Sequence, residues 1–256
     1  MLILQAIING LFTGALYGLI AMGLTLIFGV MKIINFAHGS LITIAMFCTY
    51  GFTIFTGLNL YYSVIVVCPV LFTIGYLIQK YLINSVLISE IDIREPIQVL
   101  LLTSGLWIFL DNMIVLVFGP DYHTVKEPFS SMSWFLADTI LINKAKLLAF
   151  LVSCSVAFIL LGFLNWTEPG RAIKAVGQDR QMSSLLGINT NSTFNLAFGL
   201  GAVIAGIGGI MLSAFYYVQP NMGVLFGIKS FIIVVLGGLG SIMVGLVAGI
   251  SVGLRE

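Results

Sequence analysis

Charged residues are scarce in this chain of 256 residues. Only 8% of the side chains are charged, against about 25% in a typical soluble domain, and 59% are hydrophobic with a mean hydropathy of +1.12. This composition excludes a water-soluble globule. Eleven Lys and Arg against ten Asp and Glu leave a formal net charge of +1. That charge is too small to attract a phosphate backbone, which excludes nucleic acid as a partner.

Cysteine and histidine are also rare. Cys48, Cys68 and Cys154 lie singly in apolar runs, so they form neither a Cys-x-x-Cys metal site nor a disulfide framework. His38 has no second ligand at metal-binding spacing, which favours a hydrogen-bonded structural role. His123 is predicted on the opposite side of the membrane, so the two histidines are not expected to form one site. An intramembrane enzyme would need a pattern such as paired aspartates or His-x-x-x-His, and none is present. We therefore expect no catalytic residue, no metal site and no cofactor in this chain.

Long uncharged runs dominate the rest of the sequence. A helix needs about 20 apolar residues to cross a hydrocarbon core of about 30 Å. We predict an all-α polytopic membrane protein with about seven transmembrane helices, some of them discontinuous, in a single transmembrane domain over residues 1–256. The strict alternation of a membrane β-barrel is absent. The expected crossings are 5–30, 38–56, 61–88, 96–118, 146–165, 194–217 and 229–253.

Basic residues are divided unevenly between the two sides that this topology creates. Lys and Arg are retained on the cytoplasmic side of membrane proteins, and the side that holds the loop 166–193 has seven of them against four. This count predicts a cytoplasmic loop and an N-terminus outside. The expected cytoplasmic residues are Lys32, Lys80, Arg94, Arg171, Lys174, Arg180 and Arg255, and the expected outer residues are Lys126, Lys144, Lys146 and Lys229.

Glycines recur at intervals of four in the expected helices. Small residues let helix backbones approach closely in lipid. The spacing favours packing between helices of this chain, and it leaves open a dimer interface or a moving contact. The glycines expected to pack in this way are Gly10, Gly14 and Gly18 in the first helix, Gly201 and Gly209 in the sixth, and Gly245, Gly249 and Gly253 in the seventh.

Three polar or glycine-rich interruptions fall within the apolar runs. Residues 32–40 join two crossings with hardly any loop, which is compatible with a re-entrant helix or with a tight turn. In the fourth crossing, Asp111 favours a buried hydrogen bond over a transport role. The glycine cluster 237–241 predicts a break at membrane depth, and no Gly-Lys pair supplies an ATP-binding Walker A loop. The candidates for a translocation path are Asn35, His38, Gly39, Thr103 and Ser104.

The stretch 167–191 is polar but still has helical patterning. Glu168 and Pro169 suit the first turn of a helix, and Gly187 followed by Asn189 is typical of a helix stop. Apolar residues between them recur on helical faces. We predict short helices here that lie flat against the membrane and dock a cytoplasmic partner.

The same stretch resembles a known loop. The segment from Glu168-Pro169-Gly170-Arg171-Ala172 through Gln178-Asp179-Arg180 to Leu186-Gly187-Ile188-Asn189 is similar to the ATPase-contacting loop of branched-chain amino acid ABC transporter permeases. Further matches follow in the family's order. They are Asn9-Gly10, Gly14-Ala15-Leu16-Tyr17, Ile34-Asn35-Phe36-Ala37-His38-Gly39, Phe118-Gly119-Pro120-Asp121 and Leu236-Gly237-Gly238-Leu239-Gly240-Ser241.

The resemblance implies a permease subunit that imports leucine, isoleucine and valine, or related small amino acids and amides, across the bacterial inner membrane. Its implied partners are a second permease, two cytoplasmic ATPase subunits that bind ATP and Mg, and a periplasmic substrate-binding protein. The alternative is a stand-alone secondary transporter or channel for a small polar solute. Family members usually continue through a further crossing, so a truncated chain is also expected. The implied coupling residues are Glu168, Gly170, Arg171, Ala175, Asp179 and Gly187.

Overall fold

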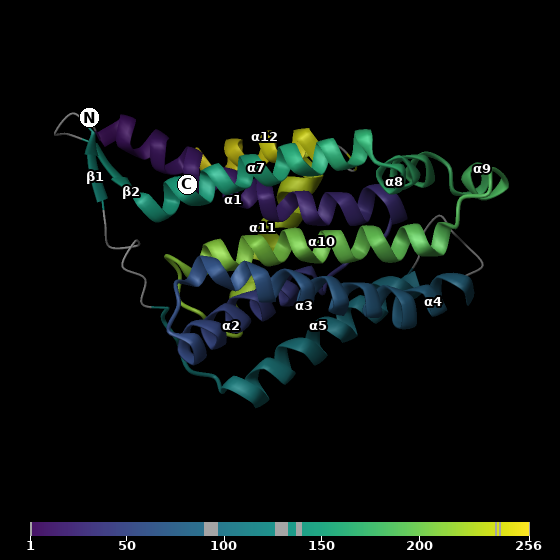
Figure 1. Cartoon of the computed structure of the whole chain (residues 1–256), viewed down its shortest axis with the longest axis horizontal. Helices are drawn as coiled ribbons and strands as arrows, with labels where there is room; N and C mark the ends of the chain where they lie inside the picture. Colours follow the sequence, from purple (N-terminus) through teal and green to yellow (C-terminus); the bar gives the residue numbers. More distant parts are fainter. Residues whose placement is uncertain are drawn as a thin grey trace.

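Long helices lie side by side in the computed structural model, which describes residues 2–89, 97–125, 133–136, 140–238, 240 and 242–255 (Figure 1). Six described helical stretches are long and apolar enough to cross a membrane, which confirms the polytopic α-helical fold. Five of them are α1 (Leu2–Met31), α2 (His38–Thr56), α5 (Ile97–Phe118), α7 (Lys144–Trp166) and α10 (Thr190–Ser213). The sixth joins a 3-10 turn (Leu60–Ser63), α3 (Val64–Leu77), a π-helix (Ile78–Ile83) and α4 (Asn84–Ser89).

The prediction of one crossing over residues 229–253 is wrong. The chain forms two shorter helices instead, α11 (Met222–Gly237) and α12 (Ile242–Gly253). At about 1.5 Å per residue they are roughly 24 Å and 18 Å long, less than the hydrocarbon core. The break falls in the predicted glycine cluster, where Gly238 and Gly240 have φ of 82° and 111°. Glycine adopts these backbone angles without the steric cost that a side chain adds.

The bundle has two distinct ends (Figure 1). At the first, the hairpin end, the N-terminus lies near the antiparallel strands β1 (Ser133–Leu136) and β2 (Ile140–Asn143). At the second, the α8 end, the short helices α8 (Glu168–Gln178) and α9 (Arg180–Leu185) lie near α4. Short helices are therefore present between residues 167 and 191, as predicted.

Two basic residues lie away from their expected places. Arg255 follows α12, which runs antiparallel to α1, so Arg255 lies at the hairpin end and not beside Arg171. Lys229 lies within the bundle, with its Nζ 3.2 Å from the Tyr17 hydroxyl and 4.6 Å from the centre of that ring. Arg255 is misplaced because the broken helix returns the chain to the end from which it came. Lys229 is misplaced because α11 already begins at Met222, so Lys229 falls in the middle of that helix. Arg94 and Lys126 lie outside the described residues.

The small-residue stretches of α1 and α12 pack on each other. A Cβ added to Gly14 would lie 2.8 Å from the Gly249 carbonyl oxygen, and one added to Gly10 would lie 2.6 Å from that of Gly253. Gly18 faces the backbone of Leu246 in the same way. The remaining predicted packing glycines face other neighbours: Gly245 faces Thr25, Gly201 faces Gly23 and Ile27, and Gly209 faces Ile42 and Ala45.

Candidate functional site

The α8 helix is fixed to the end of α7 by its first turn. The Thr167 hydroxyl caps α8 by accepting from the Gly170 backbone N–H at 3.1 Å, and it donates to the Phe163 carbonyl at 2.6 Å. Gly170 is buried against the backbone of Phe163 and Leu164, which leaves no room for a Cβ. Further along, a Cβ on Gly177 would lie 2.9 Å from the Gly29 carbonyl oxygen of α1. The α8 helix therefore packs closely on both α7 and α1.

The short helix α9 is capped at both ends. The Asp179 carboxylate accepts from the Met182 backbone N–H at 2.9 Å and so caps the start of α9. At its end, the N–H groups of Gly187 and Ile188 donate to the carbonyls of Ser184 and Ser183, both at 3.0 Å. This is a Schellman motif, with Gly187 at φ 85°.

The predicted coupling residues divide into two groups. Glu168, Arg171 and Asp179 are exposed on the surface of the α8 end. Gly170 and the half-buried Ala175 instead lie beneath that surface, and the exposed Gly187 sets the backbone turn that ends α9. The coupling residues predicted from the family resemblance therefore include both exposed side chains and residues that shape the local backbone.

Apolar side chains extend the same surface. Leu185 and Leu186 of the α9 turn are 81% and 75% exposed, and Met182 is 55% exposed. Exposed apolar side chains beside charges are typical of a surface that contacts a protein partner or the membrane interface. We name the set Glu168, Arg171, Asp179, Met182, Leu185 and Leu186 the α8–α9 surface.

The segment between α1 and α2 re-enters the bundle. Lys32 ends α1 with φ of 56°, a left-handed conformation uncommon for a side-chain-bearing residue. The chain then runs without helical structure until His38, whose Nε2 lies 3.1 Å from the carbonyl oxygen of Ile20, three turns back along α1. The Thr103 hydroxyl of α5 donates to the Ile34 carbonyl at 3.3 Å. Of the two readings of this break, the structure has the re-entrant one.

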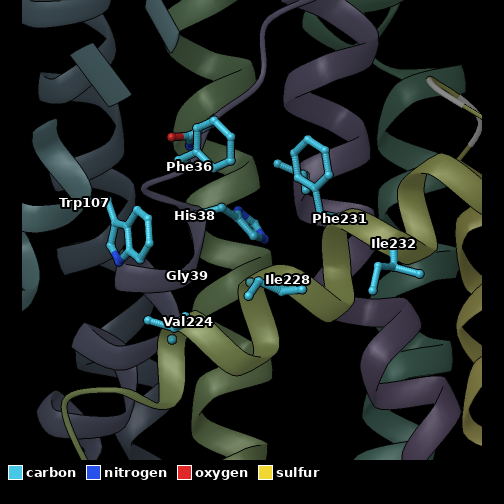
Figure 2. A pocket seen from close by; sticks show the side chains of 12 residues that line it. Phe36, His38, Gly39, Trp107, Val224, Ile228, Phe231 and Ile232 are labelled. Atoms are coloured by element: carbon cyan, nitrogen blue, oxygen red, sulfur yellow. The ribbon is translucent and has the colours of Figure 1, made fainter. Parts of the chain in front are cut away.

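A cavity of about 200 Å³ lies beside this re-entrant segment, between α2, α5 and α11. Figure 2 shows His38 and Gly39 at the start of α2, with Trp107 on one side and the obliquely running α11 on the other. Three of the five predicted path residues, Asn35, His38 and Gly39, line the cavity. Thr103 and Ser104 are not among its lining residues, and the Ser104 hydroxyl donates to the Leu100 carbonyl of its own helix at 2.8 Å.

Several lining residues could not be selected from the sequence. Trp107, Val224 and Phe231 are apolar residues in apolar runs, and nothing in their spacing marks them. Phe36 lies in the interruption 32–40 but was not among the predicted path residues. The signal that was available lies in Gly39, because a Cβ there would collide with Gly223 of α11. Close approach of α2 and α11 is what places the α11 side chains at the cavity.

Asp111 has a hydrogen-bonded structural role. Its carboxylate accepts from the Ser40 hydroxyl at 2.7 Å and from the Trp107 indole Nε1 at 2.6 Å. These bonds tie α5 to α2 and hold the Trp107 ring in place as one wall of the cavity. A carboxylate engaged in this way fits the predicted structural hydrogen bond better than ion coupling.

The two histidines lie far apart, although not on opposite surfaces as expected. His38 is inside the bundle at the start of α2, because the re-entrant segment carries it there. His123 lies at the hairpin end, where its ring stacks on Tyr50 of α2 with centroids 4.5 Å apart. Twelve residues of helix, about 18 Å, separate the two levels. Within the described residues no group of three or more His, Cys, Asp and Glu side chains is placed to hold a metal ion.

Comparison with known proteins gives matches over almost the whole chain. Residues 6–256 match the family described as branched-chain amino acid transport system, permease component. The high-affinity branched-chain amino acid transport system permease protein BraD of Pseudomonas aeruginosa is 31% identical, over 99% of this chain and 85% of that protein. The corresponding LivH protein of Escherichia coli is 28% identical, over 99% of this chain and 84% of that protein.

A solved structure, PsaBC from Streptococcus pneumoniae in complex with Fab, aligns with 96% of this chain and 78% of its own at a TM-score of 0.49 and 11% identity. The family match spans the re-entrant segment, the cavity and the α8–α9 surface alike. This chain belongs to the family of branched-chain amino acid transport system permease components.

Proposed function

We propose that this chain is the permease subunit of an ATP-binding-cassette importer in the bacterial inner membrane. The cargo is leucine, isoleucine and valine, or related small amino acids and amides. The observation that carries this proposal is the family match over residues 6–256, joined by relatives named as branched-chain amino acid permeases over 99% of the chain.

The proposed partners are a second permease, two cytoplasmic ATPase subunits and a periplasmic substrate-binding protein. ATP and Mg bind to the ATPase subunits. The α8–α9 surface supports ATPase docking because its exposed leucines and charged side chains lie on two consecutive short helices and the turn after them, at one end of the bundle. Apolar anchors beside charged side chains are typical of protein interfaces.

In the proposed mechanism, closure of the ATPase subunits pushes on the α8–α9 surface. The push reaches α7 through Gly170 and α1 through the contact between Gly177 and Gly29. The end of α1 continues directly into the re-entrant segment that lines the cavity. Tilting of these packed helices opens the central path to each side by turns, which is alternating access.

The test is ATP-driven uptake by the assembled importer. This chain is co-expressed with a second permease and ATPase subunits of the proposed importer, purified and reconstituted in liposomes, and uptake of radiolabelled L-leucine is measured with the binding protein present. We expect an ATPase subunit to co-purify and uptake to require ATP. Uptake that proceeds without ATP, or without any ATPase subunit, would instead establish the stand-alone transporter.

A further inference from the structure

Asn35 lines the cavity and carries a buried hydrogen-bond donor. Its side chain is 1% exposed, and its Oδ1 accepts from the Ala37 backbone N–H at 3.1 Å. That N–H requires an oxygen opposite it, which fixes the orientation of the amide. The Nδ2 group is buried and has no hydrogen-bond partner. Asn35 is therefore a donor without an acceptor inside the described bundle.

His38 presents the complementary group. Its ring is 2% exposed and its Nε2 lies 3.1 Å from the carbonyl oxygen of Ile20. A carbonyl only accepts, so Nε2 carries the proton and Nδ1 of the neutral ring has a free lone pair. That Nδ1 is also buried without a partner. Since unpaired buried polar atoms destabilise a protein, a ligand that satisfies both groups is favoured.

The other walls are apolar. Phe36 and Phe231 stack with ring centroids 5.9 Å apart and planes 6° apart, and Figure 2 shows Val224 and Ile228 from α11 on the same side of His38. Trp107 forms the opposite wall, positioned by Asp111. The volume of about 200 Å³ is below the roughly 300–1,000 Å³ of sites for drug-sized ligands. The cavity thus suits a small solute with an aliphatic body and two polar ends.

We propose that Asn35 and His38 form a transient site for the backbone of a branched-chain L-amino acid during translocation. Asn35 Nδ2 donates to the carboxylate, His38 Nδ1 accepts from the ammonium group, and the aliphatic side chain packs between Trp107 and α11. Trp107 is a positioning residue for that side chain. The inference rests on the proposed function, and it names how the permease itself recognises its cargo. Two direct polar contacts bind weakly enough for the cargo to leave again.

The first experiment uses Trp107 as the reporter of occupancy. The full chain carrying Trp134→Phe and Trp166→Phe keeps a single tryptophan at the cavity. Reconstituted in nanodiscs, it is titrated with L-leucine, with L-leucinamide, which lacks the carboxylate, and with 4-methylpentanoate, which lacks the ammonium group. We expect saturable binding of L-leucine, and binding of each analogue about tenfold weaker or more. No response to L-leucine, or equal affinity for all three, would overturn the proposal.

The second experiment assigns each end of the cargo to its residue. Asn35→Asp keeps the acceptor for the Ala37 N–H and removes the donor, so it should weaken L-leucine and 4-methylpentanoate about tenfold or more but spare L-leucinamide. His38→Phe keeps a ring of similar shape and removes the acceptor, so it should weaken L-leucine and L-leucinamide but spare 4-methylpentanoate. Asn112→Asp makes the same amide-to-acid change at an exposed α5 position and should leave all three unchanged.

A misfolded variant would lose binding of all three compounds together. The proposed contacts instead predict a crossed pattern, in which each variant weakens two compounds and spares a different third one. If both variants bind the three compounds as the parent chain does, the proposal is wrong. Uptake separates this result from the proposed function. If the importer transports L-leucine but the crossed pattern is absent, the proposed function stands and the proposed site is wrong. If the importer transports none of leucine, isoleucine and valine, both the proposed function and the proposed site are wrong.

Discussion

At the scale of single residues, close backbone approach decides which glycines this fold requires. Gly14 and Gly51 are both helical glycines in apolar surroundings, and their sequence contexts do not separate them. A Cβ on Gly14 would lie 2.8 Å from the Gly249 carbonyl oxygen and 2.8 Å from the Ile250 Cα, whereas nothing lies within 4 Å of a Cβ on Gly51. Backbone atoms cannot rotate away, so the α1–α12 contact depends on glycine.

Gly14→Ala should therefore destabilise the protein by about 1–3 kcal/mol through overpacking. Gly51→Ala is the matched control and should be neutral or slightly stabilising, because alanine is the better helix former by about 1 kcal/mol. The measurement is the thermal unfolding midpoint of each variant in detergent. Equal midpoints for the two variants would contradict the packing of α1 on α12.

A second residue with a conformational requirement is Gly187, at φ 85° in the helix stop after α9. Gly187→Ala should cost about 1–2 kcal/mol, because a Cβ is disfavoured in the left-handed region. Limited proteolysis should then cut the chain faster between α9 and α10. Gly105→Ala, at an open position in α5, provides the comparison and should leave the cleavage rate unchanged.

At the scale of elements, α8 and α9 combine a fixed base with an exposed outer face. Gly170 and Gly177 bring α8 against α7 and α1, and the caps at Asp179 and Gly187 set the direction of α9. The outer face is left to Arg171 and its neighbours in the α8–α9 surface. Substitutions on this face should therefore change coupling and leave folding intact.

Arg171→Glu should lower ATP-driven uptake about tenfold or more, the effect of losing about 1.4 kcal/mol of docking free energy. Its thermal unfolding midpoint should match that of the parent chain, because Arg171 is exposed. Arg255→Glu makes the same charge reversal at the hairpin end and should leave uptake unchanged. If the Arg171 variant keeps wild-type uptake and ATPase activity, the assignment of α8 to the coupling surface is wrong.

At the scale of the whole molecule, the broken last helix decides where the chain goes. A single crossing over 229–253 would place Arg255 with Arg171, but α12 returns along α1 and brings Gly253 to Gly10. Five described basic residues then lie at the α8 end, namely Lys32, Lys80, Arg171, Lys174 and Arg180, against Lys144, Lys146 and Arg255 at the hairpin end. This distribution still favours a cytoplasmic α8 end.

Cysteine labelling tests this arrangement. In a background where Cys48, Cys68 and Cys154 are replaced by serine, single Lys144→Cys, Lys174→Cys and Arg255→Cys variants are exposed to a membrane-impermeant maleimide. We expect the Lys144 and Arg255 variants to react in intact spheroplasts and the Lys174 variant to react only after the membrane is opened. If the Arg255 variant, like the Lys174 variant, reacts only after the membrane is opened, the result would instead support a single crossing over residues 229–253.

Much of the fold could be predicted because hydrophobic length is a local property of the sequence. The uncharged runs predicted α1, α2, α5, α7 and α10 to within a few residues, and Glu168, Pro169 and Gly187 marked the helices of the loop. The long-range glycine contacts were less accessible. The spacing of Gly10 and Gly14 predicted a packing face, but the identity of the facing helix depends on how the chain folds back.

The sequence by itself determined that the protein is a polytopic helical membrane protein, where its helices break, and which loop carries the helix signals and the family resemblance. Composition, period and capping residues act over one or two turns, so each can be read from neighbouring residues. Only the tertiary structure decided that Asn35 and His38 share a cavity with Trp107 and α11, and that Lys229 lies beside Tyr17. Those contacts join residues tens to hundreds of positions apart, and they form because glycine backbones pack too closely for any side chain to intervene.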